Sequence, residues 1–442
     1  MRALRHTIGR FGADRRGNIA VIFALALLPI MSMIGCTVDY SRAVQLRSKL
    51  QAAADAASVG SIAKTAPAFI AAGTMSSDGS IASGVTDAGN IFDANMTGVT
   101  GYTLNSRTPT VAKSGAVITS VVAFSATIPT MFLGLMGKST LTLAGSSTST
   151  ANMPQYIDFY LLLDNSPSMG VAATPADVTK MVNNTSDKCA FACHDYNDSN
   201  NYYDLAKDLG VTTRIDVLRS ATQSLMDTAG ATKTYSNQFR MAIYDFGASS
   251  KTIGLRALFS LSSSLTSAKT AAGNIDLMGV YGNNDAYTAD KDTQFSTIFP
   301  AITSVISTAG TGISSSPLKY LFFVSDGVAD EYNTSCLKPK ASGSRCQSPL
   351  DPALCSTLKN NKVKIAVLYT TYLQLPTNPW YMTWIDPFNQ GPFGPSPNSE
   401  IATNMESCAS PGLYFEVSPT QGISDAMNAL FQKAVADARI AS

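Results

Sequence analysis

The stretch Gln155-Tyr-Ile-Asp-Phe-Tyr-Leu-Leu-Leu-Asp164-Asn-Ser166-Pro-Ser168-Met-Gly170 decides the expected fold. Its apolar run has the length of a buried strand, and it ends in a carboxylate followed by hydroxyls two and four residues later. These three oxygens lie on one tight loop, and Mg²⁺ prefers oxygen ligands in near-octahedral geometry. The pattern predicts a metal site at the carboxyl end of a strand, with a coordination position left open for an acidic group of a partner.

Strands and helices alternate in the rest of the chain. An amphipathic helix is expected from Arg214 and a closing helix from Gly422, with apolar strands expected at 238–246, 318–325, 362–369 and 413–417. Such alternation is typical of an α/β fold with a doubly wound, mainly parallel sheet, which binds ligands at the carboxyl ends of its strands. Asp326, in Ser325-Asp326-Gly327, is therefore expected near Asp164.

The N-terminal region contains a candidate membrane span. No charged residue occurs from Gly17 to Val38, which is long enough to cross a bilayer core as one helix. Five arginines and one acidic residue precede it, so residues 1–16 are expected to stay cytoplasmic and the rest to be exported. A cleaved signal peptide is the alternative, because small residues occur near Cys36.

An amphipathic helix is expected to continue beyond this span, because Ala43, Leu46, Leu50, Ala53 and Ala57 follow helical spacing. Arg15-Arg16-Gly17-Asn18-Ile19-Ala20-Val21-Ile22-Phe23-Ala24-Leu25, with Gln51-Ala-Ala-Ala-Asp-Ala-Ala downstream, resembles the N-terminal module of TadG-like proteins of the Tad/Flp pilus-assembly family. Processed pseudopilins of that system carry a glutamate five residues after the cleavage glycine, where this chain has Ile22. We therefore expect an uncleaved anchor.

Residues 39–154 are expected to form a small α+β pilin-like module. A helix is predicted around Val85–Met96, and β-branched residues predict strands at 115–129 and 139–150, joined by a turn near Gly134–Lys138. Ile118, Val122 and Phe124 are expected in its core.

Residues 155–442 resemble a von Willebrand factor type A domain with a metal-ion-dependent adhesion site. The resemblance implies that Asp164, Ser166 and Ser168 bind Mg²⁺ or Mn²⁺, that Asp326 acts largely through water, and that a loop threonine completes the set. Thr293 is the first choice for that threonine because it opens an apolar helix, and Thr288 is the second. In the alternative interpretation Asp164 and Thr293 only cap helices and Asp326 lies in a turn.

Six of the seven cysteines follow the first strand of this domain, in expected insertions at 171–210 and 331–411. They are Cys189, Cys193, Cys336, Cys346, Cys355 and Cys408. An exported location favours disulfides, and pairing of Cys355 with Cys408 and of Cys336 with Cys346 is preferred. Cys189, Cys193 and His194 are also compatible with zinc, although a fourth ligand is not evident.

The second insertion also carries Trp380, Tyr381 and Trp384 in a Pro-rich stretch. These aromatic residues suit a recognition surface and a self-packed loop equally well.

Composition excludes several functions. Lys+Arg 32 against Asp+Glu 31 argues against a nucleic-acid partner, which normally requires a basic excess. Only 14% of residues are charged and 45% are hydrophobic, which excludes a disordered chain. With two histidines, an exported hydrolase using Ser166 or Ser168 would depend on His194. No small-molecule substrate is evident.

These observations predict a non-enzymatic, single-pass inner-membrane protein of a Tad/Flp-type pilus system, with its body in the periplasm. Its A-type domain is expected to bind a pilus-assembly or surface protein through the metal. The alternative is a surface-exposed adhesin or minor pilus subunit. The expected divisions are a cytoplasmic tail (1–16), a transmembrane helix (17–38), the pilin-like module (39–154) and the A-type domain (155–442).

Overall fold

The computed structural model describes residues 18–75, 77–192, 194–198, 201–281, 292–332, 340–342, 345–372, 374–390, 394, 396–418 and 422–440. Three candidate residues, Thr288, Cys193 and Cys336, lie outside the described residues, as does the basic tail. The chain divides into two compact units, Met1–Met153 and Pro154–Ser442.

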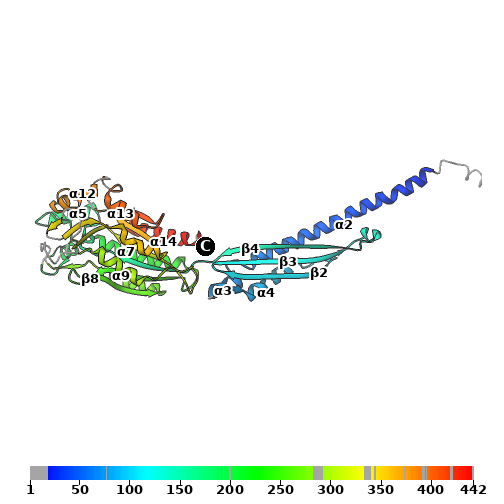
Figure 1. The fold of residues 1–442 in the computed structure, drawn as a ribbon, viewed down its shortest axis with the longest axis horizontal. Helices are drawn as coiled ribbons and strands as arrows, with labels where there is room; N and C mark the ends of the chain where they lie inside the picture. Colours follow the sequence, from blue (N-terminus) through cyan, green and yellow to red (C-terminus); the bar gives the residue numbers. More distant parts are fainter. Residues whose placement is uncertain are drawn as a thin grey trace, which may run out of the picture. The chain divides into compact units, whose positions relative to one another are not determined.

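The first unit combines helices with one antiparallel sheet (Figure 1). Its elements are α2 (Asn18–Gly60), α3 (Pro67–Thr74), β1 (Gly79–Ser80), α4 (Ala82–Met96), β2 (Thr103–Ser114), β3 (Val117–Pro129), η2 (Leu133–Met136) and β4 (Thr140–Asn152).

Helix α2 has two halves with different surroundings. Side chains of the N-terminal half, such as Phe23 and Leu25, are exposed, whereas Leu50 and Ala57 in the C-terminal half are completely buried. Among the described residues, α2 is the one helix long and apolar enough to cross a membrane. The exposed apolar half therefore fits a single-pass anchor, and Pro29 lies within the helix without ending it.

The sheet of the first unit has the strand order β1-β2-β3-β4. Alternate residues of β3 are buried, including Ile118, Val122 and Phe124, as expected from the sequence. The C-terminal half of α2 lies along this sheet, where the Ser58 hydroxyl is 2.8 Å from that of Ser149. Strand β2 was not predicted from the sequence, because its residues are mostly polar and exposed.

The second unit contains a six-stranded sheet and its helices. Its elements are β5 (Ile157–Leu163), η3 (Pro167–Gly170), α5 (Pro175–Asn184), β6 (His194–Asp195), α6 (Tyr202–Asp208), α7 (Arg214–Thr232), β7 (Phe239–Gly247), β8 (Ile253–Ser262), α8 (Leu265–Ala272), β9 (Gly279–Val280), α9 (Phe295–Val305), β10 (Leu318–Ser325), β11 (Val328–Tyr332), β12 (Lys340–Ser342), β13 (Arg345–Pro349), η4 (Pro352–Cys355), α10 (Ser356–Asn360), β14 (Lys364–Thr370), α11 (Pro379–Trp384), α12 (Asp386–Gln390), α13 (Glu400–Cys408), β15 (Tyr414–Val417) and α14 (Ile423–Ile440).

The large sheet has the order β15-β14-β10-β5-β7-β8. Neighbours from β15 to β7 pair in parallel, and β8 is an antiparallel edge strand. Every residue of the central strand β5 is buried, as expected for a strand covered on both faces. The expected mixed α/β fold is present.

Two apolar clusters cover the two faces of this sheet. Phe159 and Leu161 of β5 pack with residues of α7, α8 and α14 on one face. Tyr160 and Leu162 point to the other face and pack with residues of α9, α10 and α13. Because alternate side chains of β5 enter opposite cores, its carboxyl end emerges between two helical layers.

The cysteines follow the sequence expectation in part. Cys355 and Cys408 form a disulfide, with Cα atoms 5.5 Å apart. Cys346 is buried and disulfide-bonded. Cys189 is a free cysteine, so the disulfide expected there is absent. The Cys189 sulfur instead accepts a hydrogen bond from the backbone N–H of Phe191.

Both expected insertions contain packed structure rather than open loops. In the first insertion, Met181 of α5 and Tyr203 of α6 belong to the apolar cluster that covers one face of the large sheet. In the second insertion Tyr381 is buried and stacks on Tyr372, with ring centroids 6.1 Å apart. At Tyr381 the structure therefore favours a self-packed segment.

Candidate metal centre

The register of two parallel strands places the predicted carboxylates at one edge of the sheet. Val324 of β10 lies opposite Leu163 of β5, so both strands end at the same level. The backbone N–H of Asp164 donates to the carbonyl of Val324, at 2.9 Å. Asp164 and Asp326 thus meet at the carboxyl end of the sheet.

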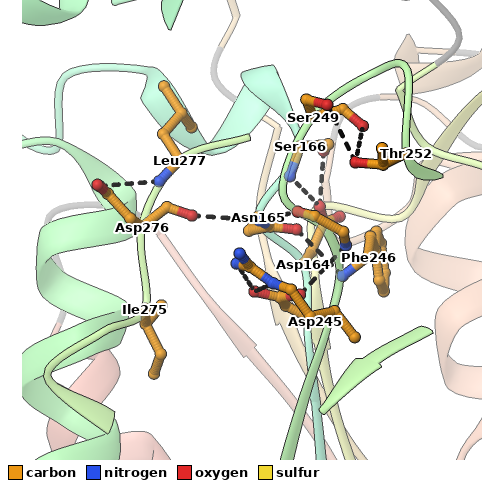
Figure 2. A network of polar contacts seen from close by, with 12 residues as sticks. Asp164, Asn165, Ser166, Asp245, Phe246, Ser249, Thr252, Ile275, Asp276 and Leu277 are labelled. Atoms are coloured by element: carbon orange, nitrogen blue, oxygen red, sulfur yellow. Dashed lines mark hydrogen bonds and ion pairs between the residues drawn. The ribbon is translucent and has the colours of Figure 1, made fainter. Parts of the chain in front are cut away.

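Hydrogen bonds hold the Asp164 carboxylate in place (Figure 2). Its Oδ1 accepts from the Ser166 backbone N–H at 2.9 Å and from the Ser166 hydroxyl at 2.6 Å. Its Oδ2 accepts from the Ser325 hydroxyl at 2.5 Å. The Ser168 hydroxyl lies 3.1 Å from that of Ser166. Asp164 and Ser166 are completely buried, whereas Ser168 is half-buried, so the cluster reaches the surface at Ser168.

The Asp326 carboxylate faces a buried arginine that the sequence analysis did not assign to the site. Arg214 Nη1 lies 3.8 Å from Asp326 Oδ2, and neither side chain is exposed. Arg214 Nη2 donates to the carbonyl of Thr371 at 2.7 Å. The sequence contains one indication that Arg214 is buried: it comes four residues before Leu218, so both lie on the same face of α7.

Asn165 holds the loop in position, and it was also missed. Its side-chain amide donates to the carbonyls of Gly247 and Asp276, and its Oδ1 accepts from the Phe246 N–H at 3.1 Å. Figure 2 shows this amide between Phe246 on β7 and the Asp276 loop. Its position within the motif gave no sign of this role.

Burial dominates the electrostatics of the two carboxyl groups. Desolvation, together with the negative charge of Asp326, raises the pKa of Asp164 to about 7, against the opposing effect of the hydrogen bonds from Ser166 and Ser325. Desolvation also raises the pKa of Asp326, against the opposing effect of the Arg214 guanidinium. Two carboxylates in one buried site favour a bound cation, because a cation offsets their repulsion.

Thr293 lies near the segment that follows Asp326. Its backbone N–H donates to the carbonyl of Asp330, and the Asp330 N–H donates back to the Thr293 carbonyl at 3.0 Å. Within the described residues no hydrogen bond joins its side chain to Asp164, Ser166, Ser168 or Asp326.

The capping alternative does not match the helix boundaries. Gln294 is the N-cap of α9, and Ser166 is the N-cap of η3. Neither Asp164 nor Thr293 occupies a cap position.

The oxygen atoms brought together here fit a small hard cation as ligands. Two carboxylates and two hydroxyls converge, and Asp326 Oδ2 is buried without a hydrogen bond within the described part of the chain. In the same residues no group of three or more His, Cys, Asp or Glu side chains is arranged to hold a metal. A metal here would therefore depend on hydroxyl and water ligands as well as carboxylates.

A hydrolytic arrangement is not evident in the described residues. The Ser166 hydroxyl donates to Asp164, and the ring of His194 packs against those of Tyr196 and Tyr203. No hydrogen bond between these residues links His194 to Ser166 or Ser168.

Comparison with known proteins gives one family match and several distant structural similarities. Residues 17–63 match the family described as putative Flp pilus-assembly TadE/G-like. No curated protein matches the chain.

The solved structures similar to this chain include two pilus proteins. The vWF domain of the type V pili tip protein Mfa5 from Porphyromonas gingivalis is 10% identical, with a TM-score of 0.37 over 64% of this chain and 97% of that one. A mutant of the PilB minor pilin from Streptococcus sanguinis is also 10% identical, with a TM-score of 0.35 over 78% of this chain and 89% of that one. These scores are too low to carry an argument about the site.

The family match therefore rests on the N-terminal helix alone. It covers the whole of α2, both the exposed apolar half and the half that packs on the sheet. Over residues 17–63 this chain is similar to the TadE/G-like proteins of Flp pilus assembly.

Proposed function

We propose that this chain is a non-enzymatic, membrane-anchored component of a Tad/Flp-type pilus system whose C-terminal unit is a von Willebrand factor type A domain. In this proposal α2 anchors the protein in the inner membrane, and the body lies in the periplasm. The doubly wound sheet presents a divalent cation to a protein partner. The TadE/G-like match supports the pilus association, and the apolar half of α2 supports the anchor.

The observation that carries the metal-dependent part is the meeting of Asp164, Ser166, Ser168 and Asp326 at the carboxyl ends of β5 and β10. Asp164, Ser166 and Ser168 would hold Mg²⁺ or Mn²⁺, with Asp326 acting through water and Thr293 as the proposed further ligand. The cation would supply an open coordination position for an acidic group of the partner.

Thermal unfolding of the full chain in detergent tests this proposal. With Mg²⁺ or Mn²⁺ at 100 times the dissociation constant, binding to the folded state alone adds about 2.7 kcal/mol of stability. We expect this gain over EDTA in the wild-type chain and its loss in Asp164→Ala.

Asp227→Ala is the matched control, because Asp227 forms an exposed ion pair with Lys269 away from the site. It should keep the full response to the metal. An equal response in wild type and Asp164→Ala would refute the site, and so would no response in either.

Protease accessibility in spheroplasts tests the location. The body should be digested from the periplasmic side and the N-terminal tail protected. A mature protein without residues 1–17, found outside the cell, would favour the surface-exposed adhesin or minor subunit.

A further inference from the structure

The turn between β3 and β4 exposes an unusual group of apolar side chains. Met131 is 65% exposed, Phe132 41%, Leu135 87% and Met136 65%. We call residues 131–136 the hairpin tip. Exposed single apolar residues are common, but four within six residues form a patch of the kind that marks an interaction site.

The hairpin tip is fixed to α2 by one buried carboxylate. The Asp39 side chain accepts hydrogen bonds from the backbone N–H groups of Met131, Phe132 and Leu133, at 2.9, 2.8 and 2.8 Å. Three donors from consecutive residues fix both the position and the orientation of the turn. The tip is therefore held in place beside the helix.

Contacts with residues that precede Asp39 place the tip against the apolar half of α2. The sulfur atoms of Cys36 and Met136 are 4.0 Å apart. Phe132 leaves no space for a side chain at position 35, because a Cβ there would lie 2.3 Å from the ring. In Figure 1 the tip is the end of the hairpin that lies beside α2.

Helix geometry puts this contact at the edge of the proposed span. With a rise of about 1.5 Å per residue, the stretch from Asn18 to Asp39 is about 32 Å long, close to the roughly 30 Å of a bilayer core. Asp39 is the first charged residue after the charge-free stretch. The hairpin tip therefore lies at the level where the hydrocarbon gives way to headgroups.

The charge pattern supports a lipid neighbour. No charged residue occurs between Lys113 and Lys138. Lys138, at the base of the tip, is exposed, and the half-buried Arg42 lies one turn beyond Asp39 on α2, with its Nη1 3.9 Å from Asp39 Oδ1. Cations beside an apolar tip suit anionic headgroups, with the apolar side chains below them.

We propose that the hairpin tip inserts into the interface of the membrane that α2 spans and forms a second, monotopic anchor. This inference rests on the proposed anchoring by α2. Its ligand is the lipid of the leaflet facing the body, and anionic lipid is preferred because of Lys138 and Arg42. With two anchors the tilt of the first unit relative to the membrane is restricted.

Depth-dependent quenching tests the proposal. The full chain is reconstituted in vesicles of phosphatidylcholine and phosphatidylglycerol containing a lipid brominated near the headgroup or near the chain end. A small environment-sensitive fluorescent amino acid replaces Leu135 at the tip, Leu25 in the span or Thr150 on the exposed side of β4. Because Leu135 and Thr150 are both exposed, neither replacement disturbs the core.

We expect the probe at 135 to be quenched by the shallow bromolipid about twofold more than the probe at 150, because interfacial side chains are buried about 5–10 Å into the headgroup boundary. The probe at 25 should respond most to the deep bromolipid. Omitting phosphatidylglycerol should weaken the quenching at 135.

Each contrary result has a distinct meaning. Quenching at 25 without quenching at 135 overturns the second anchor and leaves α2 as the only anchor. Absence of quenching at both positions overturns the anchoring by α2 itself. If the probe at 135 is shielded from water, and this shielding disappears when the protein is diluted with lipid, then a second copy of the chain covers the tip. That result also overturns the proposal.

Discussion

The guanidinium of Arg214 lies 3.8 Å from the carboxylate of Asp326, and both side chains are completely buried. Burial lowers the pKa of Arg214, while Asp326 and Asp164 oppose that effect. This arginine is the cation that the protein itself supplies to a buried site containing two carboxyl groups. With Arg214 present, a bound divalent metal would supply only part of the positive charge that neutralises the Asp326 carboxylate.

Arg214→Met should destabilise the metal-free protein by about 3–5 kcal/mol, the usual cost of leaving a buried charge without its partner. The gain in stability on adding Mg²⁺ should become larger than in the wild type, because the metal then supplies the missing positive charge. Urea unfolding of the full chain in detergent, with EDTA or Mg²⁺, measures both effects. Arg240→Met is the control, since Arg240 pairs with Asp158 away from the site. An unchanged metal response in Arg214→Met would contradict the shared role.

Asn165→Ala should weaken Mg²⁺ binding without removing a proposed ligand. Its amide joins the loop to Phe246, Gly247 and Asp276, and residues that orient ligands typically contribute about 10–100-fold to metal affinity. Asn165→Asp should be at least as damaging, because a carboxylate cannot donate to the two carbonyls. Calorimetric titration with Mg²⁺ gives the affinity, and circular dichroism checks the fold. A folded Asn165→Ala protein with wild-type affinity would contradict this positioning role.

Removal of the disulfide should lower stability without affecting the metal response. Cys355 and Cys408 are 53 residues apart, and disulfides typically contribute about 2–4 kcal/mol. The variant with Cys355→Ala and Cys408→Ala should therefore unfold earlier in urea under oxidising conditions. Its stability gain from Mg²⁺ should match that of the wild type, because neither cysteine is a proposed ligand. Wild-type stability in this variant would show that the bond constrains little.

Phe159→Ala tests the central strand. The Phe159 ring is buried and contacts the rings of Phe239, Tyr320, Phe322 and Phe431. Removing it should cost about 3–5 kcal/mol through lost burial and a remaining cavity. Val305→Ala, at the exposed end of α9, should change stability by no more than about 0.5 kcal/mol. Similar losses in the two variants would contradict the central position of Phe159 in the core.

The sequence predicted the parts of the fold that depend on apolar periodicity. The runs at 157–163 and 318–325 are apolar apart from Asp158, Lys319 and Ser325, so their strands and the shared edge at Asp164 and Asp326 followed directly. Strand β2 was missed because it exposes most of its residues, and the edge strand β8 was missed because it is only half-buried. In both strands the pairing with a neighbour decides the structure, and the local pattern gives little signal.

The site was predicted less completely than the fold. Acidic and hydroxyl residues on the motif loop could be named from their spacing, whereas Arg214 reaches Asp326 only through the packing of α7 against the sheet. The same limit applies to Asn165, whose partners are more than 80 residues away in the chain. Metal binding itself, and the role of Thr293, stay predictions.

Helix α2 runs without interruption from Asn18 to Gly60, so its 43 residues extend for about 65 Å. Its first half is the proposed anchor and its second half is built into the core of the four-stranded sheet, with no hinge between them. A helix of this kind acts as a rigid lever. With the first half in lipid, as proposed, a tilt or axial pull on it would be transmitted directly to the sheet, and the first unit would respond mechanically to forces in the membrane.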